Sequence, residues 1–226
     1  MLITTSPFTL NNAALPIVHH SAGVVGYTHR WTPYEILPAV DAACLSWTDY
    51  VGGLALSATN GPTVKALADG RKYLQHDGGN DTIRSTSVPS GDVATVIMVA
   101  RGRATDTGTT IYASGTGVSI NRNGTTGTVI NPGAAVNNPT KLDNTWRLVA
   151  AVATASDARL IIDGVKATAT AAGIWGTALR LGANGTPANF SMLDVAEVIT
   201  YPTALSDADI ALVRTAMIAA YPALLT

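Results

Sequence analysis

The stretch from Trp146 to Tyr201 limits the possible folds of this chain more than any other part of it. Residues 146–153 and 159–163 are apolar runs rich in β-branched side chains, and a short polar segment separates them. Asp163-Gly164 is a pair typical of tight turns between antiparallel strands. A further strand is predicted at 179–182. The segment therefore predicts consecutive antiparallel strands that belong to a sheet.

The last strand of this stretch, predicted at 190–201, contains an unusual carboxylate. Side chains alternate between the two faces of a strand, so Glu197 is expected among apolar neighbours, and its unpaired burial would cost several kcal/mol. The sequence therefore predicts a partner or a cleft for Glu197. The alternation assigns Leu193, Val195, Glu197, Ile199 and Tyr201 to one face, and Met192, Asp194, Ala196, Val198 and Thr200 to the other.

One helix is predicted at 206–221. Ser206 is a favourable N-cap, and Asp209 occupies the position at which a capping box carries its carboxylate. Pro222 ends the helix. The predicted apolar stripe consists of Ile210, Val213, Met217 and Tyr221, at spacings of three and four residues.

The rest of the chain shows short apolar runs between glycine and asparagine turns, the pattern of a two-sheet antiparallel sandwich. The sequence thus predicts an all-β jelly-roll sandwich with one C-terminal helix, as a single domain over 23–226. The strands expected before residue 146 lie at 23–31, 47–49, 72–76, 92–101, 109–113, 117–121 and 128–131.

Residues 1–22 follow no period of a helix or a strand and contain two prolines and a histidine pair. They are interpreted as an extended N-terminal arm. A terminal segment of this composition frays unless something holds it. We therefore expect the arm to dock on a neighbouring molecule or on the surface of its own domain.

Composition excludes some classes of function. Charged residues make up 13% of the 226 residues and the net charge is −1, which gives no electrostatic basis for binding nucleic acid or an anionic membrane. The basic pairs Arg71-Lys72 and Arg101/Arg103 are interpreted as solvated turn charges. Cys44 is the only cysteine, and it is expected to be a buried apolar residue. We expect neither a signal peptide nor a membrane span.

Several of these segments together resemble a known family. In order and spacing they are similar to a laminin G-like, concanavalin A-like jelly roll, in particular to the versions in bacteriophage tail and virion proteins. The resemblance covers roughly residues 40 to 221, and it departs from the family at Asp194, where many relatives have glycine, and at 1–30, which match nothing. The matching segments are 46–53, 69–81, 146–150, 160–164, 179–182, Phe190, 196–201 and 204–210.

The resemblance also raises an enzymatic alternative, because laminarinase-type glycosidases share this jelly roll and carry a Glu-x-Asp-x-x-Glu motif on one strand. Laid on this sequence, the motif places Met192 at the nucleophile, Asp194 at the orienting carboxylate and Glu197 at the acid/base. A thioether cannot replace a carboxylate nucleophile. We therefore expect no catalytic residue, and interpret Glu197 as a structural carboxylate held by backbone amides or by an arginine where the helix meets the sheet, with ligand binding as the alternative.

Metal and sugar sites have only weak sequence support. Asp77, Asn80 and Asp81 are expected to form a turn held by side-chain hydrogen bonds, with a calcium loop as the alternative. No cofactor and no zinc site are expected, since His19 and His20 are adjacent and point opposite ways. The remaining histidines, His29 and His76, are isolated.

Aromatic side chains offer one further ligand candidate. Of the four tryptophans, Trp146 is expected to be packed, and Trp175 is the best candidate for an exposed sugar-stacking ring. Through its resemblance the sequence predicts a non-enzymatic virion component, in the tail or decorating the capsid, made in the host cytoplasm. Its partners would be copies of itself and other virion proteins, and the alternative is a carbohydrate-binding module that attaches the particle to a host surface.

Overall fold

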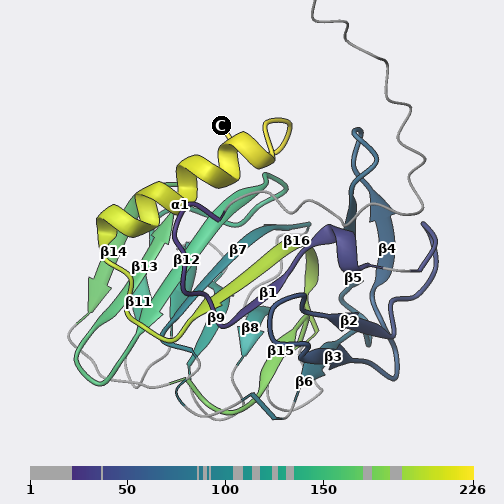
Figure 1. Cartoon of the computed structure of the whole chain (residues 1–226), viewed down its shortest axis with the longest axis horizontal. Helices are drawn as coiled ribbons and strands as arrows, with labels where there is room; N and C mark the ends of the chain where they lie inside the picture. Colours follow the sequence, from purple (N-terminus) through teal and green to yellow (C-terminus); the bar gives the residue numbers. More distant parts are fainter. Residues whose placement is uncertain are drawn as a thin grey trace, which may run out of the picture.

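The computed structural model describes residues 22–36, 38–85, 87–88, 91, 93–103, 109–113, 118–123, 127–130, 135–169, 175–183 and 190–226. In these residues two antiparallel sheets stack face to face, and one α-helix covers the outer side of one sheet (Figure 1). The predicted all-β sandwich with a C-terminal helix is therefore confirmed. No helix in the described part is both long and apolar enough to cross a membrane.

Sheet A is the sheet beside the helix. Its strand order is β14-β13-β12-β7-β16-β5-β4, and the short strand β1 pairs with β16 outside this path. The strands are β1 (His29–Trp31), β4 (Thr63–Ala66), β5 (Lys72–Asp77), β7 (Thr95–Gly102), β12 (Arg147–Ala153), β13 (Ala158–Ile162), β14 (Val165–Ala169) and β16 (Met192–Tyr201).

Sheet B forms the opposite layer, with strand order β11-β10-β9-β8-β15-β6-β3-β2. Each of these eight strands is only two to five residues long. They are β2 (Ser46–Thr48), β3 (Ala55–Ser57), β6 (Ile83–Ser85), β8 (Thr109–Ala113), β9 (Ser119–Asn123), β10 (Gly127–Ile130), β11 (Val136–Asn137) and β15 (Leu179–Leu181).

Sheet A is buried on both faces, which explains why its central strands are apolar at nearly every position. On β7, for example, Val96 and Met98 point toward sheet B, whereas Ile97 and Val99 point toward the helix. The same division holds on β12, where Val149 and Leu148 point to opposite sides. The apolar run expected at 92–101 therefore lies centrally, as predicted, although β7 begins three residues later.

The helix α1 (Asp207–Ala220) has the capping box that the sequence predicts. Ser206 Oγ accepts a hydrogen bond from Asp209 N, and the Asp209 carboxylate accepts one from Ser206 N. The predicted stripe is buried against sheet A. With Ile97, Val99, Trp146 and others, Ile210, Val213, Met217 and Tyr221 form the apolar cluster between helix and sheet.

Two local predictions have different outcomes. Asp163 and Gly164 both have positive φ, 49° and 90°, and join β13 to β14 as the expected two-residue turn. The strand expected at 23–31 is wrong except for its last three residues. Gly23 and Gly26 have φ of 82° and 88°, which breaks the extended conformation before His29.

Candidate functional site

Glu197 lies at the point where β16 changes its pairing partner. Residues 192–195 of β16 pair with β5, whereas residues 198–200 pair with β1. Between these segments the register of β16 against β7 shifts, as in a β-bulge, between Val195 and Glu197. An extra residue reverses the alternation of side chains beyond it. The expected alternation over 192–201 is therefore wrong, because Glu197 lies on the face of Asp194 and not on that of Leu193 and Val195.

The partner predicted for Glu197 is Arg30. Arg30 on β1 is the register partner of Ile199, so its side chain is diagonal to Glu197 on the same face. Arg30 Nε lies 2.7 Å from Glu197 Oε1, and both side chains are 1% exposed. The Tyr221 hydroxyl, at the end of α1, donates to Glu197 Oε2 at 2.5 Å. The carboxylate thus connects β1, β16 and the helix.

The electrostatics of this cluster fit a structural role. Burial would lower the pKa of Arg30, but the Glu197 carboxylate outweighs burial and the pKa stays above its ordinary value. Burial raises the pKa of Tyr221 well above 10, and the neighbouring carboxylate raises it further. Arg30 therefore remains a cation and Tyr221 a neutral donor across the physiological pH range.

Asp194 is buried beside two arginines. Its carboxylate is 0% exposed and lies 2.7 Å from Arg101 Nε and 2.9 Å from Arg103 Nε. Burial raises the pKa of Asp194 although the two guanidinium groups oppose this effect. The guanidinium of Arg101 also stacks over the Trp146 ring, 4.9 Å from its centroid. The interpretation of Arg101 and Arg103 as solvated turn charges is therefore wrong, since they compensate a buried carboxylate.

Arg71 also departs from the prediction of a solvated charge. Its guanidinium lies over the Tyr221 ring, 4.3 Å from the centroid, and donates to the carbonyl of Ala220. It also pairs with Asp69 at 2.5 Å. Arg71 thus satisfies a carbonyl at the C-terminus of α1, where a cation is favoured by the helix dipole.

The prediction of an exposed ring at Trp175 is also wrong. Trp175 is 8% exposed and belongs to the apolar cluster between the sheets, and its indole Nε1 donates to the Ala94 carbonyl at 3.1 Å. The adjacent glycines suggested an open loop, but the ring packs inward. Trp146 is packed as predicted, edge-to-face with Tyr73. Trp31 and Trp47 are fully buried.

The turn at 77–81 is held by its own side chains, as expected. Asp77 Oδ1 accepts from Gly79 N at 2.6 Å, and Asp81 Oδ2 accepts from Asp77 N at 3.1 Å. Asn80 is exposed. Within the described residues, no group of three or more His, Cys, Asp or Glu side chains is placed to hold a metal ion.

The isolated histidines are buried in different surroundings. His29 Nδ1 lies 3.0 Å from Asp49 Oδ2. His76 is fully buried, and burial lowers its pKa to about 4. His19 and His20 lie outside the described residues. Cys44 is buried, as predicted, and burial raises the pKa of its thiol.

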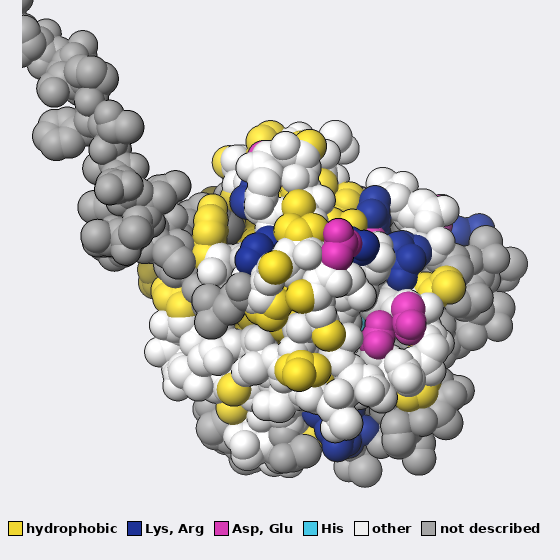
Figure 2. Space-filling model, turned by 90° about the vertical axis from the view of Figure 1, so that its right-hand side faces the viewer, with side chains coloured by type: hydrophobic (Ala, Val, Ile, Leu, Met, Phe, Trp, Pro, Cys, Tyr) yellow, Lys and Arg dark blue, Asp and Glu magenta, His cyan; other side chains and the backbone are white. Residues whose placement is uncertain are grey.

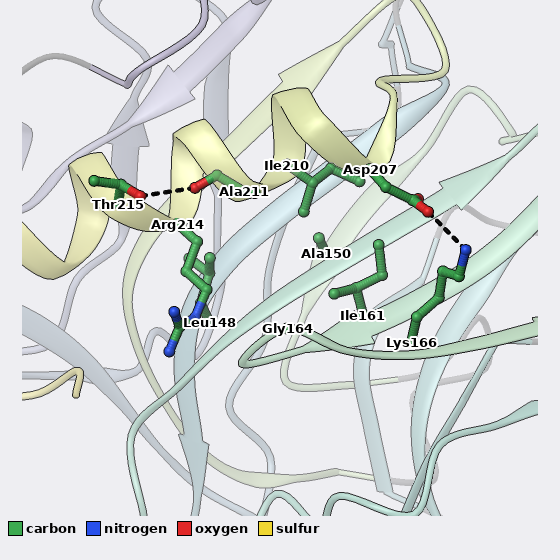
Figure 3. A pocket seen from close by; sticks show the side chains of 10 residues that line it. All are labelled: Leu148, Ala150, Ile161, Gly164, Lys166, Asp207, Ile210, Ala211, Arg214 and Thr215. Carbon is green, nitrogen blue, oxygen red and sulfur yellow. Dashed lines mark hydrogen bonds and ion pairs between the residues drawn. The ribbon is translucent and has the colours of Figure 1, made fainter.

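A cleft between α1 and sheet A is the first open candidate site (Figure 3). Its volume is about 380 Å³, and its floor consists of Leu148, Ala150 and Ile161 on β12 and β13. Lys166 and Asp207 pair across one end at 2.6 Å, and Arg214 extends beside Leu148 at the other. The arrangement offers an apolar floor between charged ends, which suits a peptide segment better than a small polar solute.

A second hollow lies on the outer face of sheet B, over β3 and β6. It is polar and has a volume of about 410 Å³. The sequence did not predict this site, because strands β3 and β6 were missed: each has only three residues, too few to show alternation. Its lining consists of Ala55, Ser57, Ala58, Thr59, Arg84, Ser85 and Ser87.

Comparisons with known proteins support the fold of this chain, but they do not show its family or its activity. No protein-family model and no curated protein matches the chain. Among solved structures, a Trypanosoma rangeli sialidase in complex with the inhibitor DANA has a TM-score of 0.64 at 11% identity, over 84% of this chain and 32% of that chain. These likenesses show a β-sandwich.

Two further structures are similar. Botulinum neurotoxin type C, whose cell entry depends on interaction with two ganglioside molecules, has a TM-score of 0.59 at 12% identity, over 84% of this chain and 51% of that chain. An arabinofuranosidase complexed with arabinofuranosyl-alpha-1,2-xylobiose has a TM-score of 0.56 at 13% identity, over 88% of this chain and 60% of that chain. The chain thus spans between a third and three fifths of these structures.

Proposed function

We propose that this chain is a non-enzymatic structural component of a bacteriophage virion, in the tail or on the capsid, which acts through contacts with copies of itself and with other virion proteins. The virion assignment rests on the sequence resemblance to laminin G-like phage proteins. The low share of charged residues, 13%, supports a role in protein contacts. On the face drawn in Figure 2, uncharged and hydrophobic side chains cover most of the described surface, and the charged ones gather in a few places.

The proposal that the chain is not an enzyme rests on the burial of Asp194 and Glu197, the two carboxylates that match the glycosidase motif. A retaining glycosidase needs two carboxyl groups that reach one glycosidic bond. The side chains of Asp194 and Glu197 are 0% and 1% exposed, and each is paired with arginine. A substrate would have to displace Arg30 and Tyr221 to reach Glu197. The residue that takes the nucleophile position, Met192, has no carboxylate.

For the contact surface we propose the cleft beneath α1, occupied by residues 1–21 of a second copy of this chain. That segment contains no Lys, Arg, Asp or Glu, and it carries seven Leu, Ile, Val and Phe side chains, which suit an apolar floor. It joins the domain beside α1: Ala22 is buried in the helix-side cluster, and Gly23 packs against the backbone of Leu212.

The test uses the chain with and without residues 1–21. We expect the full chain to sediment as an oligomer and the shortened chain as a monomer with an unchanged melting temperature. A peptide of residues 1–21 should bind the shortened chain, and Ala211→Trp, which fills the cleft from the exposed side of α1, should abolish that binding. A scrambled peptide is the control. Equal oligomerisation of both chains would refute the role of the segment.

Carbohydrate binding is the second candidate function. Two observations favour it: the fold is similar to those of a sialidase, an arabinofuranosidase and a toxin whose entry depends on gangliosides, and the hollow on sheet B is lined by hydroxyl groups and an arginine. This function is compatible with the first, because a virion protein can attach its particle to a host surface. Titration of the intact chain with oligosaccharides tests it.

A further inference from the structure

A row of polar side chains crosses the outer face of sheet B. The register places Ser46 opposite Ser57, Ser57 opposite Arg84, and Arg84 opposite Arg180, so that one row runs over β2, β3, β6 and β15. The intervening residues, such as Leu56 and Ile83, point into the core and are fully buried. Alternation therefore directs the polar row outward, away from sheet A.

The hollow beside this row is lined mainly by hydroxyl groups and one arginine. Its exposed hydroxyl groups belong to Ser57, Thr59 and Ser87, and its cation is Arg84. Hydroxyl groups both donate and accept hydrogen bonds, as the hydroxyl groups of a sugar ring do. The described lining has no aromatic ring and no carboxylate, so that charge is the main source of affinity available there.

Charge at this site favours an anion. Within the part of the chain that the structure describes, the Arg84 guanidinium makes no hydrogen bond or ion pair, in contrast to Arg30, Arg71 and Arg101. Arg84 and Arg180 lie directly opposite each other on neighbouring strands, and like charges in that position repel.

We propose that this hollow, the Arg84 groove, binds the carboxylate of an acidic saccharide. The planar guanidinium of Arg84 matches a carboxylate with two parallel hydrogen bonds, and the surrounding hydroxyl groups bind the ring. The inference rests on the carbohydrate-binding function and specifies its ligand class; it does not depend on the cleft beneath α1.

Calorimetric titration of the full chain tests the groove. The probes are 3′-sialyllactose, trigalacturonic acid, neutral lactose and inorganic phosphate, so that two sources of a sugar carboxylate are compared with a sugar alone and an anion alone. The variants are Arg84→Gln, which removes the charge, and Arg84→Lys, which keeps the charge but lacks the planar guanidinium and its two parallel donors. Lys141→Gln, which removes a charge at an exposed lysine outside the groove, is the matched control.

We expect one or both acidic saccharides to bind, at least tenfold tighter than lactose and phosphate. Arg84→Gln should weaken this binding at least tenfold and Arg84→Lys by less, while Lys141→Gln leaves it unchanged. Binding that Arg84→Gln does not weaken would overturn the groove and leave the carbohydrate function in place. Equal binding of lactose, or of phosphate, would overturn the acidic saccharide as the ligand. An absence of binding to all three saccharides would overturn both the groove and the carbohydrate function.

Discussion

The ion pair between Arg30 and Glu197 allows a quantitative test of the fold. Glu197→Gln preserves the shape of the side chain and an oxygen that accepts from Tyr221, but it removes the charge that compensates Arg30. Both side chains are 1% exposed and the two atoms are 2.7 Å apart, so solvent cannot replace the lost partner. Breaking a buried pair on one side costs about 3–5 kcal/mol, which we expect for Glu197→Gln.

The companion variant separates the ion pair from packing. Arg30→Met removes the other charge at similar volume, and by itself it should cost a similar amount. The double variant contains no unpaired charge, so its cost should be smaller than the sum of the two single costs by at least about 2 kcal/mol. A smaller cost of this size would show that Arg30 and Glu197 interact mainly through their charges.

Urea unfolding followed by circular dichroism measures these costs. With a slope of about 2–3 kcal/mol per molar urea, Glu197→Gln should lower the midpoint by about 1–2 M. Tyr221→Phe, which removes one hydrogen bond to the carboxylate, should cost about 1.5–3 kcal/mol. Lys141→Gln, at an exposed lysine, should cost less than about 0.5 kcal/mol. If the two single costs simply add in the double variant, the proposed coupling through charge is wrong.

Three further measurements test other parts of the structure. The free energy of unfolding should fall by about 3 kcal/mol as the pH decreases from 6.5 to 4. The pKa of His76 is about 4 in the folded chain and 6.5 in the unfolded one, so the unfolded chain binds the proton first. The variant His76→Gln should lack this pH-dependent loss of stability. Gly182→Ala should cost more stability than Gly70→Ala by at least about 2 kcal/mol. Both glycines have positive φ, but a Cβ at 182 would lie 2.1 Å from His76 Nδ1, whereas one at 70 would meet nothing within 4 Å. Equal costs in thermal unfolding would contradict this contact. Ser206→Ala should lower stability by about 1 kcal/mol through the lost cap, whereas Thr215→Ala, later in the same helix, should change it little.

Strong local patterns in the sequence predicted the elements that carry them. The helix could be placed because a cap, a stripe and a terminating proline agree over 206–222. The turn at Asp163-Gly164 could be placed because few residue pairs adopt positive φ at two successive positions. The central strands β7 and β12 could be placed because both of their faces are apolar. These features depend on neighbours within a few residues, and the sequence contains that information directly.

Other features depend on residues far apart in the chain, and only the tertiary structure decided them. Glu197 changed face because of a bulge where β16 passes from β5 to β1, which no local pattern indicates. Its partner, Arg30, is 167 residues away. The Trp175 ring is buried although glycines flank it, because it packs between the sheets. The Arg84 groove exists because three-residue strands align Ser57, Arg84 and Arg180. By itself, the sequence determined where side chains alternate and where the chain turns; the pairing of distant strands determined which charges are buried together and which remain open to a ligand.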